Sequence, residues 1–171
     1  KFPYARLSID TYWSSIVRKA YDLIGDFVVN DISAGQEDVD MLPTIGELGL
    51  EYVAMHIRGN SLSMQSLTDY DSVTDEVFQY FQEFSQKAAK YGIKKWMLDP
   101  GFGFAKTIEQ NYQMLRELDT FNNIISADGS SPRILVGVSR KSMIYKRFSI
   151  TPEEALPASQ VLHLKALMAG A

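Results

Sequence analysis

The stretch Ile134-Leu-Val-Gly-Val138 is continuously apolar, and Phe27-Val-Val29 has the same character. Strands of a parallel sheet are buried on both faces, so they carry unbroken apolar runs instead of alternating polar and apolar residues. Each β-type run of this chain is followed by polar or Gly-rich residues and then by a helix-like segment. The order strand, helix, strand, helix predicts a parallel α/β architecture. The expected strands are residues 6–10, 27–30, 52–56, 95–99 and 134–138.

The longest expected helix carries clear start and stop signals. Ser72 can cap its N-terminus, and Gly92 offers a left-handed exit at its C-terminus. Apolar residues recur between these positions at helical spacing, which predicts that one stripe of the helix packs on the sheet. The stripe consists of Val73, Val77, Phe81, Phe84 and Ala88.

A second helix is expected to start at the capping box Thr151-Pro-Glu-Glu154 and to run towards Met168. Weaker helical patterns cover residues 12–23, 39–48 and 108–118. Pro43 marks either an early helical position or a kink. Residues 122–131 are polar and are expected to form a loop.

The composition is that of an ordinary globular protein, with 46% hydrophobic residues in a chain of 171. The apolar runs are far shorter than the roughly 18 residues that span a bilayer. A net charge of -4 argues against nucleic acid as a partner, and the lack of cysteine excludes disulfides and thiolate metal sites. We expect residues 1–171 to form a single cytoplasmic domain that binds neither a membrane nor nucleic acid. Because the chain starts with Lys1, we also expect it to be a piece of a longer protein.

Polar residues stand at the carboxyl ends of all five expected strands, where ligands bind in such folds. They are Asp10, Asn30, His56, Asp99 and Ser139. Each one alone is better explained as a helix cap or turn former, but five together favour a site for a polar ligand. Asp10 and Asp99 could form a metal pair, an acid and base pair, or hydrogen-bond acceptors for a nitrogen-rich ring. His163 lies inside a predicted helix and is expected to be structural.

The loop Asp99-Pro-Gly-Phe-Gly-Phe-Ala-Lys106 is the most specific motif. Its two glycines allow sharp turns and a close approach of the backbone to a ligand, and its phenylalanines could hold a flat molecule. Phe102 could equally plug the core beneath the loop. The segment Ser139-Arg-Lys-Ser142 could bind an anion or donate a hydrogen bond to a ring carbonyl. Alternatively, it is a basic turn exposed to solvent.

Together, these motifs resemble the dihydropteroate synthase family, in the same order and over essentially the whole chain. The matching segments are residues 8–11, 30–35, 55–59, 99–106 and 137–142. The resemblance implies a (β/α)8 TIM barrel, which typically has about 250 residues. This chain would span the third strand to the seventh helix and lack the first, second and eighth strands. We expect such a piece alone to be poorly stable, because both edges of its sheet would be open.

The family's reaction joins 6-hydroxymethyl-7,8-dihydropterin pyrophosphate to p-aminobenzoate, giving 7,8-dihydropteroate and pyrophosphate. The resemblance implies that Asp10, Asp99 and Lys141 are the catalytic residues. Asp10, Asn30 and Asp99 would line the pterin pocket, and Lys141 would donate to the pterin carbonyl or a ring nitrogen. The further substrate-binding residues would be Ile32 and Met55 as apolar walls, Phe104 beneath the aminobenzoate, and Gly137, Ser139, Arg140 and Ser142 around the mouth.

The resemblance also implies Mg²⁺, held mainly by the substrate's pyrophosphate and by residues outside this chain, and a homodimer. Two alternatives stay open. Methyltetrahydrofolate-dependent methyltransferases resemble the same barrel and also bind a pterin edge with Asp and Asn. The chain could otherwise belong to a pterin-binding paralogue that has lost turnover.

Overall fold

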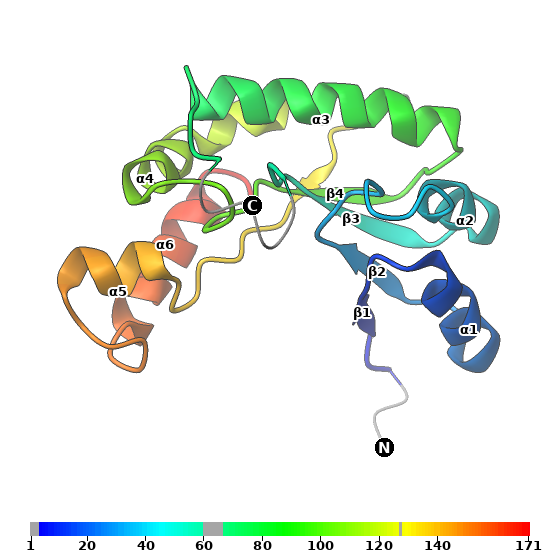
Figure 1. Cartoon of the computed structure of the whole chain (residues 1–171), viewed down its shortest axis with the longest axis horizontal. Helices are drawn as coiled ribbons and strands as arrows, with labels where there is room; N and C mark the ends of the chain where they lie inside the picture. Colours follow the sequence, from blue (N-terminus) through cyan, green and yellow to red (C-terminus); the bar gives the residue numbers. More distant parts are fainter. Residues whose placement is uncertain (1–3, 60–66, 127) are drawn as a thin grey trace.

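Five parallel strands form the sheet of the computed structural model, which describes residues 4–59, 67–126 and 128–171. Neighbouring strands along the chain are neighbours in the sheet, in the order β1-β2-β3-β4-β5. The predicted parallel α/β architecture is therefore confirmed (Figure 1). The strands are β1 (Ser8–Asp10), β2 (Val28–Asp31), β3 (Glu51–Met55), β4 (Trp96–Asp99) and β5 (Arg133–Ile134).

The fifth strand is shorter than the sequence predicts. Only Arg133 and Ile134 pair with β4, and one further backbone bond runs from Leu135 N–H to the carbonyl of Leu98 at 2.8 Å. β4 ends at Asp99, and the next residue is Pro100, which has no N–H to donate. Residues 135–138 therefore run past the end of the strand that β5 pairs with.

The described chain has six α-helices and a 3-10 helix, of which the last two follow the last strand. They are α1 (Ser14–Ile24), α2 (Met41–Leu48), α3 (Val73–Lys90), α4 (Ile108–Arg116), the 3-10 helix η2 (Leu118–Asn123), α5 (Ser142–Phe148) and α6 (Leu156–Met168). The three weaker predicted helices are confirmed as α1, α2 and α4, with Pro43 in the first turn of α2. Neither α5 nor η2 was predicted, and η2 overlaps the expected polar loop only at its first two residues, Asn122 and Asn123.

The helix α6 starts later than its capping signal suggests. Thr151 and Glu154 do exchange the reciprocal hydrogen bonds of a capping box, at 2.9 and 3.3 Å. A turn over residues 152–155 follows, and the helix proper begins at Leu156 with Pro157 in its first turn. Proline's fixed φ favours that first-turn position, so the helix starts there.

The core lies between the helices and the sheet, with α3 as its longest helix. Ser72 Oγ caps α3 by accepting from Asp75 N–H at 3.4 Å, and Gly92 follows the helix at φ 71°. Every member of the predicted apolar stripe is buried. Phe84 packs edge-on against Trp96 of β4, with ring centroids 5.0 Å apart. Aromatic pairs of this kind bury large areas and fix α3 on the sheet.

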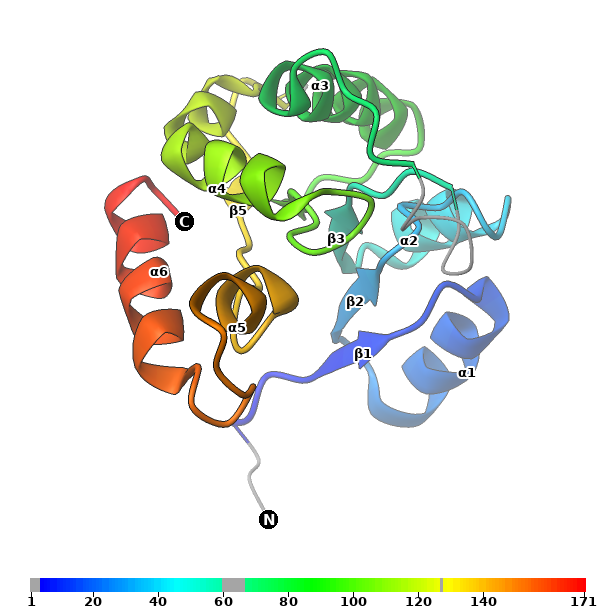
Figure 2. The ribbon, with the colours of Figure 1, turned by 60° about the vertical axis from the view of Figure 1, so that its left-hand side comes forward.

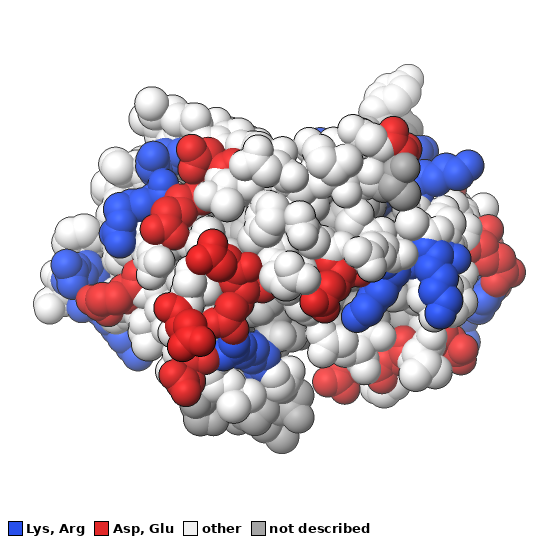
Figure 3. Space-filling model, turned by 90° about the horizontal axis from the view of Figure 1, so that it is seen from above, with Lys and Arg blue, Asp and Glu red and all other residues white. Residues whose placement is uncertain are grey.

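The helices α1, α2, α3, α4 and α6 lie outside the strands, and the other face of the curved sheet is turned inward (Figure 2). Side chains alternate between these faces along each strand. No helix in the described ranges is long and apolar enough to cross a membrane. Acidic and basic side chains are interspersed over the face seen from above α3 (Figure 3).

Candidate functional site

The register of the sheet places the predicted strand-end residues on one face. Asp10 pairs with Asn30, Asn30 pairs with Val53, and Met55 pairs with Asp99. Paired residues of neighbouring strands lie side by side on the same face, as do residues two apart along a strand. Asp10, Asn30, Met55 and Asp99 therefore share the inner face at the carboxyl end of the sheet.

Residues of the opposite face confirm this assignment, because they pack under the helices. Val29, Tyr52, Ala54 and Leu98 alternate with the inner residues and belong to the hydrophobic core. Asp31, next to Asn30, is also on this outer side, where its carboxylate accepts from Tyr52 Oη at 2.5 Å and from Gly35 N–H at 2.8 Å. Asp31 thus shapes the loop after β2, while Asn30 faces the site.

Asp99 is the buried acid of the site, with 9% of its surface exposed. Its Oδ1 accepts a hydrogen bond from Gly101 N–H at 2.8 Å, and none of the described residues donates to its Oδ2. Burial raises the pKa of the Asp99 carboxyl, because removal from water disfavours the charged form. The hydrogen bond from Gly101 and the charges of Lys141 and Lys106 partly oppose this shift.

Lys141 reaches the site from the residue before α5. Its Nζ donates to the carbonyl of Phe102 at 2.5 Å and lies 4.8 Å from the centre of the Phe104 ring. A cation over an aromatic face is attracted by the ring's quadrupole. Burial lowers the pKa of Lys141, and the charge of Asp99 raises it. Gly137 is close as well, since a side chain there would begin 3.8 Å from Lys141 Nζ.

The two phenylalanines of the Gly-rich loop have different surroundings. Phe102 is fully buried in the hydrophobic core, which decides between the two interpretations of this residue in favour of the core plug. Phe104 is half-buried and lies against Lys141. Of the two rings, only Phe104 is therefore available to a ligand.

The remaining predicted site residues differ in exposure. Met55 is only 3% exposed and Ile32 is half-buried, so Met55 would form a floor and Ile32 a wall. Ser139 and Arg140 are exposed on the turn after β5, and Ser142, the first residue of α5, is half-buried. Two of the three polar mouth residues are thus in contact with solvent.

A buried lysine was not among the predicted site residues. Lys106 closes the loop after β4, and its Nζ lies 3.0 Å from His56 Nδ1. Asn111 of α4 supports the same loop, accepting from Gly103 N–H at 2.7 Å and donating to Lys106 O at 3.3 Å. The signal was present in the sequence, because Lys106 ends the motif, but lysine is rarely expected inside a protein.

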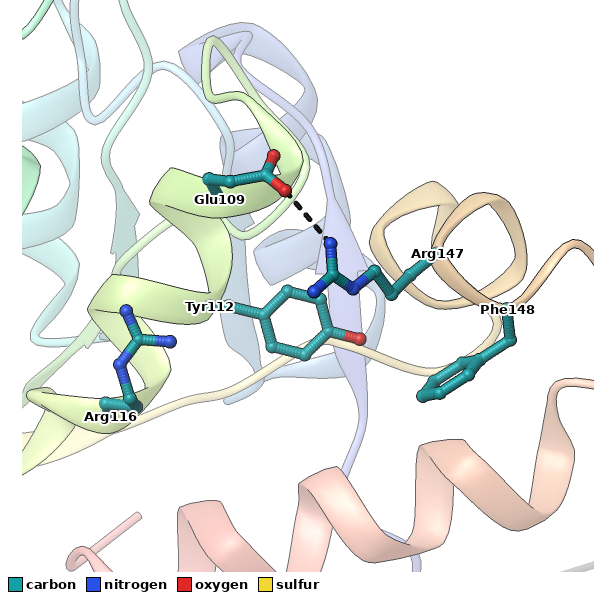
Figure 4. Close-up of a pocket in the computed structure, with 5 residues that line it drawn as sticks. All are labelled: Glu109, Tyr112, Arg116, Arg147 and Phe148. Carbon is teal, nitrogen blue, oxygen red and sulfur yellow. Dashed lines mark hydrogen bonds and ion pairs between the residues drawn. The ribbon is translucent and has the colours of Figure 1, made fainter.

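A cavity of about 250 Å³ lies elsewhere, between α4 and α5 (Figure 4). Its lining residues are Glu109, Tyr112, Arg116, Arg147 and Phe148, none of which was a predicted site residue. Arg147 donates to Glu109 at 3.2 Å across it. This cavity is thus separate from the row of strand-end residues.

Comparison with known proteins connects the site to a family. The chain matches the family described as pterin binding enzyme over residues 2–171. Dihydropteroate synthase of Escherichia coli (strain K12) is 36% identical over 96% of this chain and 56% of its own length. Dihydropteroate synthase of Synechocystis sp. is 39% identical over 82% of this chain and 47% of its own length. The chain thus spans about half the length of these relatives.

Solved structures show the same likeness. A Yersinia pestis dihydropteroate synthase with a sulfonamide drug complex has a TM-score of 0.88 and 30% identity, covering 98% of this chain and 59% of that one. Dihydropteroate synthase from Thermus thermophilus in complex with 6HMPPP has a TM-score of 0.86 and 31% identity, covering 98% and 64%. The likeness confirms that the five strands are part of a (β/α)8 barrel.

Proposed function

Because the chain belongs to the family of pterin binding enzymes, we propose that it forms the pterin-binding part of a dihydropteroate synthase. The reaction would join 6-hydroxymethyl-7,8-dihydropterin pyrophosphate to p-aminobenzoate and release pyrophosphate. The observation that carries this proposal is the shared inner face of Asp10, Asn30 and Asp99. The names of the relatives favour the synthase over a methyltetrahydrofolate-dependent methyltransferase.

Recognition of the pterin would depend on complementary donors and acceptors. The aminopyrimidinone edge presents adjacent N–H donors, and Oδ2 of Asp99 can accept from them. Asn30 can both donate and accept, and Lys141 can donate to the ring carbonyl or a ring nitrogen. In a buried site, a ring that lacks these groups would leave Asp99 unpaired, which costs several kcal/mol and gives strong discrimination, of the order of 10⁴-fold.

Turnover would depend on positioning. An electron-rich dihydropterin can stabilise a cation at its methylene carbon as pyrophosphate leaves, and the aniline nitrogen of p-aminobenzoate then attacks that carbon and loses a proton. The protein would hold the weak nucleophile close and exclude water, so no covalent enzyme intermediate is needed. Phe104 would support the aminobenzoate ring, while Ser139, Arg140 and Ser142 would surround the mouth. A relative from Thermus thermophilus solved in complex with 4-aminobenzoate supports this substrate class.

Mg²⁺ would accompany the pyrophosphate of the substrate. In the described part of the chain, no group of three or more His, Cys, Asp or Glu side chains is placed to hold a metal ion. The roles given to Asp99, Asn30 and Lys141 do not depend on the metal. The homodimer and the cytoplasmic location expected from the sequence stay predictions.

Pyrophosphate release by the full-length protein tests the proposal. We expect release only when both the pterin pyrophosphate and p-aminobenzoate are present, and a strong loss in Asp99→Asn. Binding of the pterin without release of pyrophosphate would instead indicate the non-catalytic paralogue. Methyl transfer from methyltetrahydrofolate to a cobalamin acceptor would indicate the methyltransferase and refute the synthase.

A further inference from the structure

Lys106 is a buried cation that the proposed reaction does not use. Only 6% of its surface is exposed. Its Nζ donates to the carbonyls of Gly101 and Phe104, each at 3.1 Å, and lies 3.0 Å from His56 Nδ1. An ammonium has three donors, so all three are used.

The loop that Lys106 spans needs such an anchor. Gly101, Gly103 and Ala105 have φ values of 72°, 80° and 50°, in the left-handed region. For Ala105, a non-glycine residue, this conformation costs of the order of 1 kcal/mol, and surrounding contacts must hold it. Gly101 also packs so closely on the end of β3 that a Cβ there would lie 2.1 Å from His56 O. Lys106 therefore ties this loop to the strand end beneath it.

The same loop positions Lys141. Lys141 Nζ donates to the carbonyl of Phe102. Along the chain, Phe102 lies between Gly101 and Phe104, whose carbonyls accept from Lys106 Nζ. A shift of the loop would move the Phe102 carbonyl and the Phe104 ring, both of which contact Lys141. The contacts thus run from Lys106 through the loop backbone to a residue at the site.

We propose that Lys106 is a positioning residue, which fixes residues 101–104 so that the Phe102 carbonyl and the Phe104 ring direct Lys141 into the site. That the ligand met by Lys141 is a pterin rests on the proposed function. The positioning of Lys141 itself does not, because the contacts exist in the protein without a ligand.

The charge of Lys106 gives this arrangement a pH dependence. Burial lowers the pKa of Lys106 to about 7, the charge of Asp99 opposes this, and the charges of Lys141 and Arg58 add to it. His56 also faces Lys106, and burial holds its pKa well below the usual value, so it stays neutral. Tyr80 packs edge-on against His56, and burial raises its pKa to about 12. Lys106 is therefore the group of this cluster that titrates near neutrality, and its loss of a proton removes one of the three donors.

Lysine ζ-nitrogen NMR of the ligand-free full-length protein tests the positioning directly. We expect the Lys141 signal to move when Lys106 titrates near pH 7, and to lose this inflection in Lys106→Met. Lys19→Met, which changes an exposed lysine of α1, is the matched control and should leave the signal unchanged. A Lys141 signal that is the same in Lys106→Met and in Lys19→Met would overturn the proposal. If Lys106→Met does not fold, Lys106→Arg replaces it, and a Lys141 signal that is the same in Lys106→Arg and in Lys19→Met would overturn the proposal equally.

A double-mutant cycle on binding of a pterin pyrophosphate analogue is the second arm. Lys106→Met should weaken binding about tenfold in the wild-type background and have almost no further effect in Lys141→Met, because the two residues act as one unit. Lys106→Arg, which keeps the charge and donors, should recover part of the loss. Additive effects would contradict action through Lys141. Wild-type protein that binds no pterin would refute the proposed function, while the NMR result would still decide the positioning role.

Discussion

The two carboxylates of the proposed pterin site lie in opposite environments. Asp99 ends β4, which has a neighbour on each side, and it is buried and held by Gly101 N–H. Asp10 ends β1, the first strand of this chain, and no described residue donates a hydrogen bond to its carboxylate. The loop that follows Asp99 is held by hydrogen bonds to Lys106 and Asn111. In the segment that follows Asp10, the side chain of Trp13 is half exposed to water.

This difference separates two ways of supplying an acceptor to a ligand. The cost of removing Asp99 from water is already met in the folded protein, so a ligand gains a strong, fixed acceptor. Asp10 has no donor like Gly101 N–H among the described residues, so the ligand must order its carboxylate, which leaves a smaller net gain. We therefore expect the β4 side of the site to supply most of the affinity and the β1 side to supply little.

The largest effect should come from the part of the β4 loop that is buried in the core. Phe102→Ala removes a fully buried ring and should lower the free energy of unfolding by about 3–5 kcal/mol. Phe104→Ala, on a half-buried ring two residues away, should cost only about 1 kcal/mol. Chemical denaturation of the two full-length variants measures the contrast. Equal losses of unfolding free energy would contradict the assignment of Phe102 to the core and of Phe104 to the site.

The next largest effect concerns the two acids themselves. Asp99→Asn should weaken binding of a pterin pyrophosphate analogue by about 2–4 kcal/mol, which is about 30-fold to 1000-fold, because a charge-assisted hydrogen bond in a buried site is lost and the new amide group faces the pterin's own donors. Asp10→Asn should weaken it only about threefold to tenfold, since no described residue holds the Asp10 carboxylate in the way that Gly101 N–H holds that of Asp99. Calorimetric titration of both full-length variants compares them. A loss at Asp10 equal to that at Asp99 would break the comparison.

The strand ends on both sides of the site could be predicted from the sequence, because apolar runs buried on both faces leave a clear signal. The choice between Phe102 and Phe104 as the core residue could not, since both lie in a loop without periodicity. The short β5 depends on where β4 ends in space, and the seven residues of α5 are too few for a helical pattern to stand out. The role of Lys106 depends on carbonyls that only the folded loop brings together.

A smaller effect concerns the pH dependence of stability. The pKa of Asp99 is raised by burial, so the folded protein binds this proton more readily than the unfolded chain does. The contribution of Asp99 to stability is then present at low pH and is lost as the pH rises through the raised pKa. Asp99→Asn, whose amide oxygen can still accept from Gly101 N–H, should be at least as stable as wild type at pH 8. Its advantage should disappear towards pH 4 in denaturation curves, and an advantage of Asn that grows on acidification would contradict the sign.

Substitutions at the turn after β5 should have the smallest effect on pterin binding. This turn has exposed side chains, like the β1 side of the site, and a buried hydrogen bond, like the β4 side. Ser139 and Arg140 are exposed like Asp10, yet Arg140 N–H donates to the Oγ of the fully buried Ser159 at 2.9 Å, and this hydroxyl donates to Ala155 O at 2.7 Å. Arg140 has φ 52°, a strained conformation that this contact helps to hold. Ser159→Ala should cost about 0.5–1.5 kcal/mol of unfolding free energy, because it removes two hydrogen bonds but leaves an N–H that water can reach.

Binding of the pterin analogue should change at most about threefold in Ser159→Ala, since Lys141 is held mainly by the β4 loop and only secondarily by its own turn. Ser15→Ala, at an exposed position of α1, is the control for the loss of a serine hydroxyl and should change neither property. Measuring stability and affinity of the same full-length variants separates the two roles of the turn. A tenfold or larger loss of affinity would place the control of Lys141 in the turn after β5, and the β4 loop would then be the minor support.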